Sequence, residues 1–390
     1  MSDLAYLDHA ATSPIRPEVV DAMMPYFGER FGNPSSSHRF GRAAKAGLEG
    51  ARRQVADALG VEPGQVIFTS GGTEADNLAL IGGALAAKAA GRPMTVVTTT
   101  TEHKAVLAAA SAVARMGGES VLLPVDGVGQ LHRAAFEEAL GRSPAVVSVM
   151  WVNNETGALQ PIAELAAACR DAGVRFHTDA VQALGKVPVS AAAIPGALIS
   201  ISGHKVGAPK GIGALIVPDR GAVAALVHGG GQQFGVRPGT EHVAGAVALG
   251  EATRLAVAEQ ESHAAKLEAL RQRLLDGLRR ALPDLVVHAD AGPRAPHIAN
   301  LSAPGAESEA LLMHLDLAGV AASGGSACST GAVEPSHVLT AMGVPDALGR
   351  AAVRFSLGPT STDAEVDRAV AAYPTAVARV RELGMALGRV

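Results

Sequence analysis

The run from Ser200 to Lys205 (SISGHK) places an amine directly after a β-branched, apolar strand candidate. A lysine that leaves a buried strand is partly desolvated, which lowers its pKa and makes the neutral amine available for imine formation. Lys210 follows in a turn-like sequence, APKG, and is expected to be solvated. Lys205 is therefore the candidate for covalent chemistry.

Cys328 is the second candidate, because it lies among small residues between Ser323 and Gly331 (SGGSACSTG). Glycine-rich neighbours are typical of an accessible, mobile loop, which suits a nucleophile that reaches a substrate and then delivers its product. Cys169 lies in an apolar helical stretch and is expected to be a small buried hydrophobe. Two cysteines are too few for a disulfide framework, so we expect free thiols in a reducing compartment.

A phosphate site is predicted between Thr69 and Asn77 (TSGGTEADN), where a strand passes through two glycines into a helix. Around Gly72 and Thr73, backbone N–H groups can approach an anion closely, and the helix start presents the positive end of its dipole. The alternative is a capped helix start formed by Thr73 and Asp76. The run lacks the Gly-Lys-Ser/Thr ending of a nucleotide P-loop, so a nucleotide is disfavoured.

An acidic residue, Asp179, ends the strand candidate that begins at Val174, and Gln182 lies one turn later. A buried carboxylate keeps its charge only when it is paired, and a protonated pyridine nitrogen is a suitable partner. The alternative is a helix N-cap.

These candidates follow short β-branched runs that alternate with helical segments, which predicts an α/β fold. Apolar strands without clean alternation favour a mostly parallel sheet that is covered by helices on both faces, with a ligand site at the carboxyl ends of its strands. The predicted strands are 66–69, 96–99, 146–149, 174–176, 198–201 and 214–217.

A chain of 390 residues exceeds the usual size of one core, so two domains are expected. Residues 241–282 read as an interdomain helix, and strand candidates at 285–287 and 297–301 predict a smaller α/β domain after it. The leucines at 267, 270, 274 and 278 share one face of that helix. We expect an N-terminal segment (1–15) that packs with the small domain, a large domain (16–264) and a small C-terminal domain (265–390) with the Cys328 loop.

Charge and hydropathy argue against several kinds of ligand. A net charge of −4 with scattered lysines and arginines predicts no direct nucleic-acid binding. The first residues lack the features of a signal peptide and the apolar runs are too short to cross a bilayer, so we expect a cytoplasmic protein without membrane contact. We predict no metal site.

Taken together and in this order, the motifs resemble those of the cysteine desulfurases, which belong to the class V aminotransferase group of fold-type I pyridoxal-phosphate enzymes. The matching motifs are 6–12 (YLDHAAT), 31–36 (FGNPSS), 101–104 (TEHK), 152–157 (VNNETG), 354–358 (RFSLG), the Ser-x-His-Lys run and the Ser-Ala-Cys loop. The resemblance covers nearly the whole chain and implies a seven-stranded type of sheet in the large domain, a smaller C-terminal domain and a homodimer.

The resemblance also implies a pyridoxal 5'-phosphate site. Lys205 would hold the cofactor, Asp179 would protonate its ring nitrogen, Gln182 and Asn154 would bond near its phenolic oxygen, and His103 would stack on the ring. Its phosphate would take Gly72, Thr73, Ser202, His204 and, from the neighbouring subunit, Thr240. Taken singly, His103 reads as a satisfied core imidazole.

For the substrate, L-cysteine, the resemblance implies that Arg354 clamps the carboxylate, with Asn33 and Asn154 completing the pocket. Taken singly, Arg354 reads as a surface ion-pair partner. The thiolate of Cys328 would take the sulfur as a persulfide and leave L-alanine, with His103 moving protons. A sulfur-acceptor protein would follow, in iron–sulfur cluster assembly or a thiolation pathway, and the sequence leaves its identity open.

Three departures and three alternatives accompany this interpretation. The family often has an acid where Gln233 stands and a longer or charged residue where Pro359 stands, and the chain ends at Val390 without the C-terminal extension that some members use for scaffold docking. The alternatives are a selenocysteine lyase, an aminotransferase on the same scaffold, and a non-catalytic assembly partner. Cys328 disfavours the aminotransferase, because transamination needs no mobile thiol.

Overall fold

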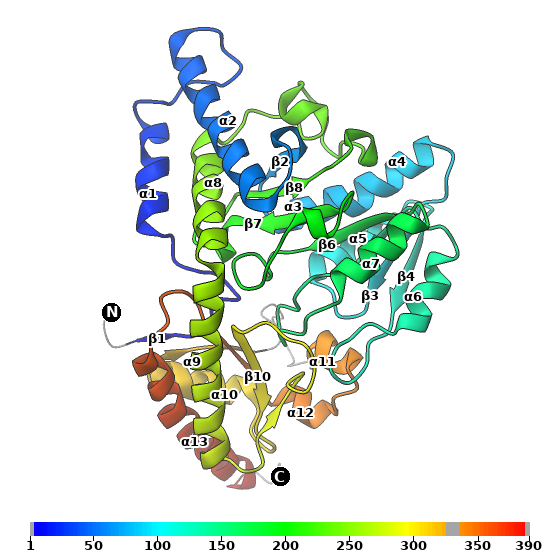
Figure 1. The fold of residues 1–390 in the computed structure, drawn as a ribbon. Coiled ribbons are helices and arrows are strands. Elements are labelled where there is room, and N and C mark those ends of the chain that lie inside the picture. The colour runs from blue at the N-terminus through cyan, green and yellow to red at the C-terminus, as the bar shows by residue number, and fades with distance from the viewer. Residues whose placement is uncertain (1–3, 325–334, 387–390) are drawn as a thin grey trace.

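The computed structural model describes residues 4–324 and 335–386. Its centre is a seven-stranded sheet in the order β2-β8-β7-β6-β5-β3-β4 (Figure 1). β8 runs antiparallel to both of its neighbours, and the pairs from β7 to β4 are parallel. The strands are β2 (Val66–Thr69), β3 (Thr95–Thr99), β4 (Glu119–Leu123), β5 (Val146–Ser148), β6 (Arg175–Asp179), β7 (Leu198–Ser202) and β8 (Gly213–Ile216). The predicted mostly parallel sheet is confirmed.

Hydrophobic side chains cover both faces of this sheet. Consecutive strand residues alternate between two cores: Phe68 and Val97 belong to one, whereas Ile67 and Val96 belong to the other. Fully buried strands therefore show no in-out alternation in the sequence. β4 was not predicted from the sequence. It is an edge strand, and four of its five residues are exposed or only partly buried, so it lacks the continuous apolar run of the central strands.

Helices pack on each face of the sheet and form the outer layers. The helices of the large domain are α1 (Pro17–Met23), α2 (Arg39–Leu59), α3 (Gly72–Asn77), α4 (Gly83–Ala89), α5 (Lys104–Arg115), α6 (Arg133–Leu140), α7 (Ile162–Asp171) and α8 (Val243–Ala258). α2 and α7 share a core with one face, and α5 shares a core with the other. Helices on both faces of the sheet were predicted, and the structure agrees.

A separate hydrophobic core lies in the C-terminal part of the chain and is built on the sheet β12-β13-β10-β9. The four leucines predicted to share a helix face are all buried in it. The elements of this part of the chain are α9 (Gln260–Ala281), β9 (Val286–Val287), β10 (Ile298–Ser302), α10 (Ser308–Leu317), β11 (Val320–Ala321), β12 (Ser323–Gly324), α11 (His337–Ala341), α12 (Asp346–Arg350), β13 (Ala352–Ser356) and α13 (Asp363–Ala386). The N-terminal strand β1 (Ala5–Tyr6) pairs with β11. The exact domain boundaries stay a prediction.

The single long helix predicted from 241 to 282 was wrong, because the structure has two helices, α8 and α9. Glu259 interrupts the helical backbone between them, with φ −100° and ψ 2°. Its carboxylate accepts a hydrogen bond from Arg16 at 2.6 Å, which ties the junction to the start of α1. In Figure 1 the two helices follow one another along the side of both domains.

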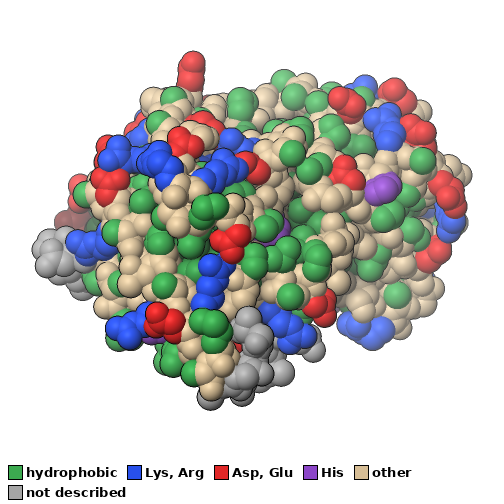
Figure 2. Space-filling view, turned by 90° about the horizontal axis from the view of Figure 1, so that it is seen from below, with side chains coloured by type: hydrophobic (Ala, Val, Ile, Leu, Met, Phe, Trp, Pro, Cys, Tyr) green, Lys and Arg blue, Asp and Glu red, His purple; other side chains and the backbone are tan. Residues whose placement is uncertain are grey.

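The surface seen from below carries interspersed acidic and basic side chains, and the described residues form no continuous basic patch on this face (Figure 2). Among the helices of the described ranges, none is both long and apolar enough to cross a membrane.

Candidate active site

A cavity of ≈ 200 Å³ lies where the central strands of the large sheet end. Parallel strands place their carboxyl ends along one edge of a sheet, which is where open α/β sheets bind ligands. Asp179 is the last residue of β6 and Ser202 is the last residue of β7. The other lining residues follow β2, β3, β5, β6 and β7, except Ala10, which comes from the N-terminal segment. The lining residues are Ala10, Gly72, Thr73, Asp76, His103, Met150, Asn154, Asp179, Val181, Gln182, Ser202, His204 and Lys205.

The structure therefore brings most of the predicted cofactor residues to one cavity. Thr240 and Asn33 are exceptions, since both are exposed and neither lines it. The side chain of Asn33 instead accepts a hydrogen bond from Ser35 N at 2.9 Å. Arg354 does not line the cavity either, but its guanidinium donates to the carbonyl of Asn154, which does. Cys328 lies outside the described residues.

The amine of Lys205 is half-buried in this cavity and donates to two backbone carbonyls, Ala10 O and Ala11 O, both at 2.6 Å. Burial, and then the positive charge of Arg354, lower the pKa of Lys205 to about 8, although Asp8 and Asp179 act in the opposite direction. Lysine in water titrates near 10.4. A much larger fraction of this amine is therefore neutral and nucleophilic at physiological pH.

Three carboxyl groups lie buried at the cavity or against it. Asp179 accepts a hydrogen bond from Val181 N at 2.8 Å, and burial raises its pKa while His103 and Lys205 lower it. Asp76 is 1% exposed, and burial together with the charge of Asp179 raises its pKa. Burial raises the pKa of Glu102 to about 8. Asp179 alone of the three has a lysine, Lys205, among the groups that favour its charged form, so it is the acid best suited to pair with a positive group in the cavity.

Below Asp179 the sheet holds a buried imidazole, His177, whose two ring nitrogens are both hydrogen-bonded. Ser148 lies 2.8 Å from Nδ1 and Ser200 lies 2.9 Å from Nε2, each on a neighbouring strand. Burial lowers the pKa of His177 to about 3, so the ring is neutral. This residue was not predicted from the sequence. Its spacing of two from Asp179, which puts both side chains on the same face of β6, is a signal that could have found it.

His103 occupies the N-cap of α5, where its Nδ1 accepts a hydrogen bond from Ala105 N at 3.2 Å. That bond assigns the proton of the neutral ring to Nε2. Burial lowers the pKa of His103, and Asp179 partly offsets this effect. The result is a neutral imidazole in the cavity wall that is available for stacking and for proton transfer.

The amide of Gln182 is held between two segments. Its Nε2 donates to Ala10 O at 2.9 Å, and its Oε1 lies 3.2 Å from His297 Nε2. Because burial holds the pKa of His297 well below its ordinary value, that ring is neutral and donates to the amide oxygen. The orientation of Gln182 is therefore fixed before any ligand binds.

One end of the cavity offers a set of donors suited to an anion. It combines the hydroxyls of Thr73 and Ser202 and the ring of His204. Gly72 completes it: a Cβ there would meet Val181 Cγ2 at 3.0 Å and Ser202 Cβ at 3.5 Å, so glycine is what lets the backbone approach this end closely. Short hydroxyls, backbone N–H groups and a glycine turn are groups that could hold a phosphate.

A second cavity of ≈ 310 Å³ shares Lys205 and extends towards α1, α8 and α9. Its wall includes Lys186, a buried amine whose Nζ donates to Lys205 O at 2.7 Å. Burial, and then the charge of Lys205, lower the pKa of Lys186 to about 7. This contact holds the backbone of Lys205 in place, and it was not predicted from the sequence.

The two described positions at which the chain departs from the family pattern, Gln233 and Pro359, do not line the ≈ 200 Å³ cavity. Gln233 is buried with φ 46° and accepts hydrogen bonds from Arg52 at 3.1 Å and Phe68 N at 3.0 Å. Pro359 lines the second cavity, and its carbonyl accepts from Lys266 at 2.7 Å. Gln233 thus accepts a hydrogen bond from Arg52 through a neutral amide oxygen, at a position where the family often has a carboxylate.

Cys169 is fully buried on α7, and burial raises the pKa of its thiol to about 12. A thiol in this state is a poor nucleophile. The prediction that Cys169 is a small core residue agrees with the structure.

Comparison with known proteins identifies the family of this chain. The family model for class V aminotransferases matches residues 5–369. An IscS-like cysteine desulfurase of Mycobacterium tuberculosis is 43% identical over 388 residues, which cover 98% of this chain and 98% of that protein. The cysteine desulfurase NifS of Azotobacter vinelandii is 42% identical over 384 residues, 98% of this chain and 94% of the relative.

Solved structures show the same fold. A NifS-like protein superimposes with a TM-score of 0.87 at 31% identity and covers 97% of this chain and 99% of its own. A structure of SspA in complex with cysteine has a TM-score of 0.79 at 31% identity, over 92% of this chain and 100% of its own. The chain thus belongs to the class V aminotransferase family and, within it, is a cysteine desulfurase.

Proposed function

We propose that this chain converts L-cysteine to L-alanine with pyridoxal 5'-phosphate bound in the ≈ 200 Å³ cavity, and that it stores the sulfur as a persulfide on Cys328. One observation supports this most strongly. A lysine amine with a lowered pKa and a buried carboxyl group, whose charged form that lysine favours, line the same cavity. The solved relative with bound cysteine supports the choice of substrate.

The residues of the cavity fit this cofactor. Lys205 would hold it covalently, Asp179 would face its ring nitrogen, His103 its ring, and Gln182 and Asn154 its phenolic oxygen. The phosphate would take the cradle of Gly72, Thr73, Ser202 and His204. When bound, the cofactor supplies an electron sink that makes bonds at the substrate's α-carbon and β-carbon easier to break.

Three side chains would then act on the substrate. Arg354 would bind its carboxylate, since a planar fork of donors matches two carboxylate oxygens. Lys205 would move the α-proton, because an amine with a pKa of about 8 exchanges protons near neutral pH. The neutral ring of His103 would carry protons between the substrate and the attacking thiol.

Cys328 would attack the substrate sulfur as a thiolate, so that an S–S bond forms and the C–S bond of cysteine breaks. In the net reaction L-cysteine and the Cys328 thiol give L-alanine and the Cys328 persulfide, without any external oxidant or reductant. The persulfide sulfur would pass to an acceptor protein, in iron–sulfur cluster assembly or a thiolation pathway. We further propose a cytoplasmic homodimer in which Thr240, exposed on its own chain, reaches the phosphate of the neighbouring subunit.

Replacing each cysteine separately tests the sulfur step. Cys328→Ala should abolish alanine and sulfide formation from L-cysteine while cofactor absorbance stays unchanged. Cys169→Ala, at the buried thiol, is the matched control and should retain activity. Alanine formation that survives in Cys328→Ala would contradict the proposal. The same variant still active on selenocysteine would favour a lyase, and unchanged transamination would favour an aminotransferase.

Borohydride reduction tests the cofactor attachment. The wild-type protein should be yellow and should keep a covalent pyridoxyl group on Lys205 after reduction. Lys205→Ala should lose that group, whereas Lys210→Ala, at an exposed lysine, should keep it. A pyridoxyl group on any other lysine, or a colourless wild-type protein, would contradict the proposed attachment.

A further inference from the structure

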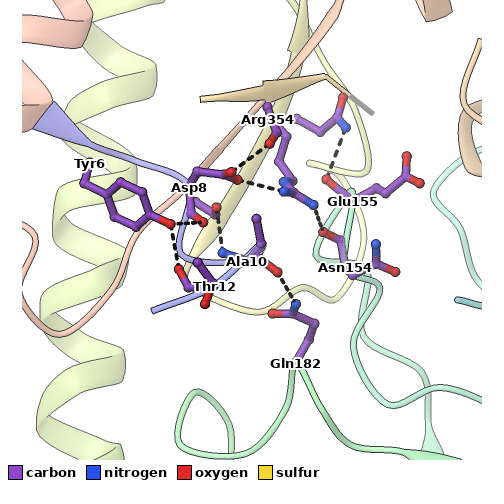
Figure 3. A network of polar contacts seen from close by, with 12 residues as sticks. Tyr6, Asp8, Ala10, Thr12, Asn154, Glu155, Gln182 and Arg354 are labelled. Carbon is purple, nitrogen blue, oxygen red and sulfur yellow. Dashed lines mark hydrogen bonds and ion pairs between the residues drawn. The ribbon is translucent and has the colours of Figure 1, made fainter. Parts of the chain in front are cut away.

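Asp8 follows Leu7, which is buried in the C-terminal core, and both oxygens of its carboxylate are engaged (Figure 3). Oδ1 accepts a hydrogen bond from the guanidinium of Arg354 at 2.8 Å, and Oδ2 accepts from the hydroxyl of Ser323 at 2.8 Å. Ser323 and Arg354 are themselves paired across β12 and β13. The carboxylate therefore bridges two neighbouring strands and has a fixed orientation.

Arg354 depends on this contact for its position. Its side chain is 5% exposed, and Asp8 is the one acidic residue in the described ranges with which it forms an ion pair. One terminal nitrogen donates to Asn154 O at 2.9 Å, the other donates to Asp8, and Nε has no partner. A guanidinium has five N–H donors, so donors remain for a further acceptor. Figure 3 shows the group held between Asp8 and Asn154.

The same segment also holds the reactive amine. The backbone of Asp8 is fixed, because its carbonyl accepts from Tyr6 Oη at 3.2 Å and from Ala11 N at 3.0 Å. Two carbonyls further along the turn, Ala10 O and Ala11 O, accept hydrogen bonds from the amine of Lys205 at 2.6 Å each. A single short turn therefore contacts the guanidinium at one end and the amine at the other.

We propose that Asp8 is a positioning residue for the substrate carboxylate, which orients Arg354 and fixes its place relative to Lys205. This inference rests on the proposed function, in which Arg354 binds that carboxylate. Asp8 does not touch the substrate and acts through the arginine. A guanidinium that is already held in a fixed orientation binds the substrate carboxylate more tightly, because it does not have to be ordered when the substrate binds.

A purely structural role is the competing explanation, since a buried arginine needs a counter-charge wherever it lies. The chain contains a comparable pair, Arg271 and Asp290, although Asp290 also accepts a hydrogen bond from Arg279 at 2.6 Å. Arg271 is also buried, donates to the carbonyl of Ile298 at 2.8 Å and to Asp290 at 2.7 Å, and has one nitrogen without a partner. Neither Arg271 nor Asp290 lines the ≈ 200 Å³ cavity.

The experiment compares Asp8→Ala, Asp8→Asn and the control Asp290→Ala in the holoenzyme. Asp8→Ala should raise KM for L-cysteine about tenfold or more with a smaller change in kcat, because a charge-assisted hydrogen bond is lost. It should also weaken binding of L-alanine, measured by calorimetry, by a similar factor. Asp8→Asn keeps an oxygen for Arg354 and should recover most of the loss. Asp290→Ala should lower Tm but leave the KM for L-cysteine and the affinity for L-alanine within about twofold of wild type.

A double-mutant cycle decides whether Asp8 acts through the arginine. In an Arg354→Ala background, Asp8→Ala should weaken L-alanine binding no further, since residues that act through one contact are not additive. Additive losses, or an Asp8→Ala variant that behaves like Asp290→Ala, would overturn the inference. Failure of the proposed function gives a different result. A wild-type protein that forms no alanine from cysteine would refute that function, whereas the double-mutant cycle measured by L-alanine binding would still decide the role of Asp8.

Discussion

Attachment of pyridoxal phosphate to Lys205 should depend on pH in a way that the structure specifies. An amine must be neutral to attack an aldehyde, and the pKa of Lys205 is lowered to about 8. At pH 7 roughly a tenth of such an amine is neutral, against about 0.0004 for a lysine near pKa 10.4, a difference of a few hundredfold. The rate should rise about tenfold per pH unit below pH 7, bend near pH 8 and become constant above it.

The assay mixes cofactor-free protein with pyridoxal phosphate at a series of pH values, traps the product with borohydride and locates it by mass spectrometry. Arg354→Gln removes a positive charge that lowers the pKa of Lys205, so its midpoint should move to higher pH. Lys186→Met controls for the second buried amine, which lines the other cavity and should not be labelled. A wild-type midpoint near pH 10, or labelling that is independent of pH, would refute the reasoning.

Three further variants test separate parts of the structure. Burial raises the pKa of Glu102 to about 8, so its contribution to stability is full below about pH 4.5 and is lost as the pH rises towards 8. The variant Glu102→Gln cannot ionise, so its free energy of unfolding relative to wild type should increase by about 3 kcal/mol between pH 4.5 and pH 7 in denaturant titrations. An unpaired amide N–H in the variant would lower its stability by the same amount at both pH values. A flat difference would show that Glu102 is ionised in the folded protein. Gly72→Val should weaken the affinity for pyridoxal phosphate in calorimetry, because a Cβ there meets Val181 Cγ2 at 3.0 Å, and unchanged affinity would place the phosphate elsewhere. Gln233→Ala should lower the free energy of unfolding by about 1–3 kcal/mol, since it leaves buried donors of Arg52 and the backbone unpaired, and a change below about 0.5 kcal/mol would show that water replaces the amide.

The architecture was largely predictable from local patterns. Runs such as 66–69 and 198–201 lie within observed strands because β-branched residues buried on both faces leave a continuous apolar signature. The sequence of β4 has no such signature, since an edge strand with partly exposed residues has the mixed polar and apolar composition of a loop. The break at Glu259 was also missed, because a junction between two helices depends on partners from elsewhere, here Arg16.

The candidate site was predictable to the extent that its residues stand in motifs. Lys205, Asp179 and Gln182 were found because each lies at or just after the end of a strand, and strand ends in an α/β sheet converge, whereas His103 was found only through the family resemblance. Asp76 had been noticed only as a capping partner, and Lys186 and Asp8 had no predicted role. Their importance comes from contacts across 19 to 346 positions of sequence, such as Lys186 with Lys205 and Asp8 with Arg354.

The sequence by itself determined the class of fold, the order of the motifs and the membership of the family, because these depend on residue type and spacing. Only the tertiary structure decided the protonation tendencies and the orientations of the side chains in the site. A pKa depends on burial and on charges in space, as the different environments of Asp179, Asp76 and Glu102 show. The same holds for Arg354, whose guanidinium is oriented by a carboxylate from the opposite end of the chain.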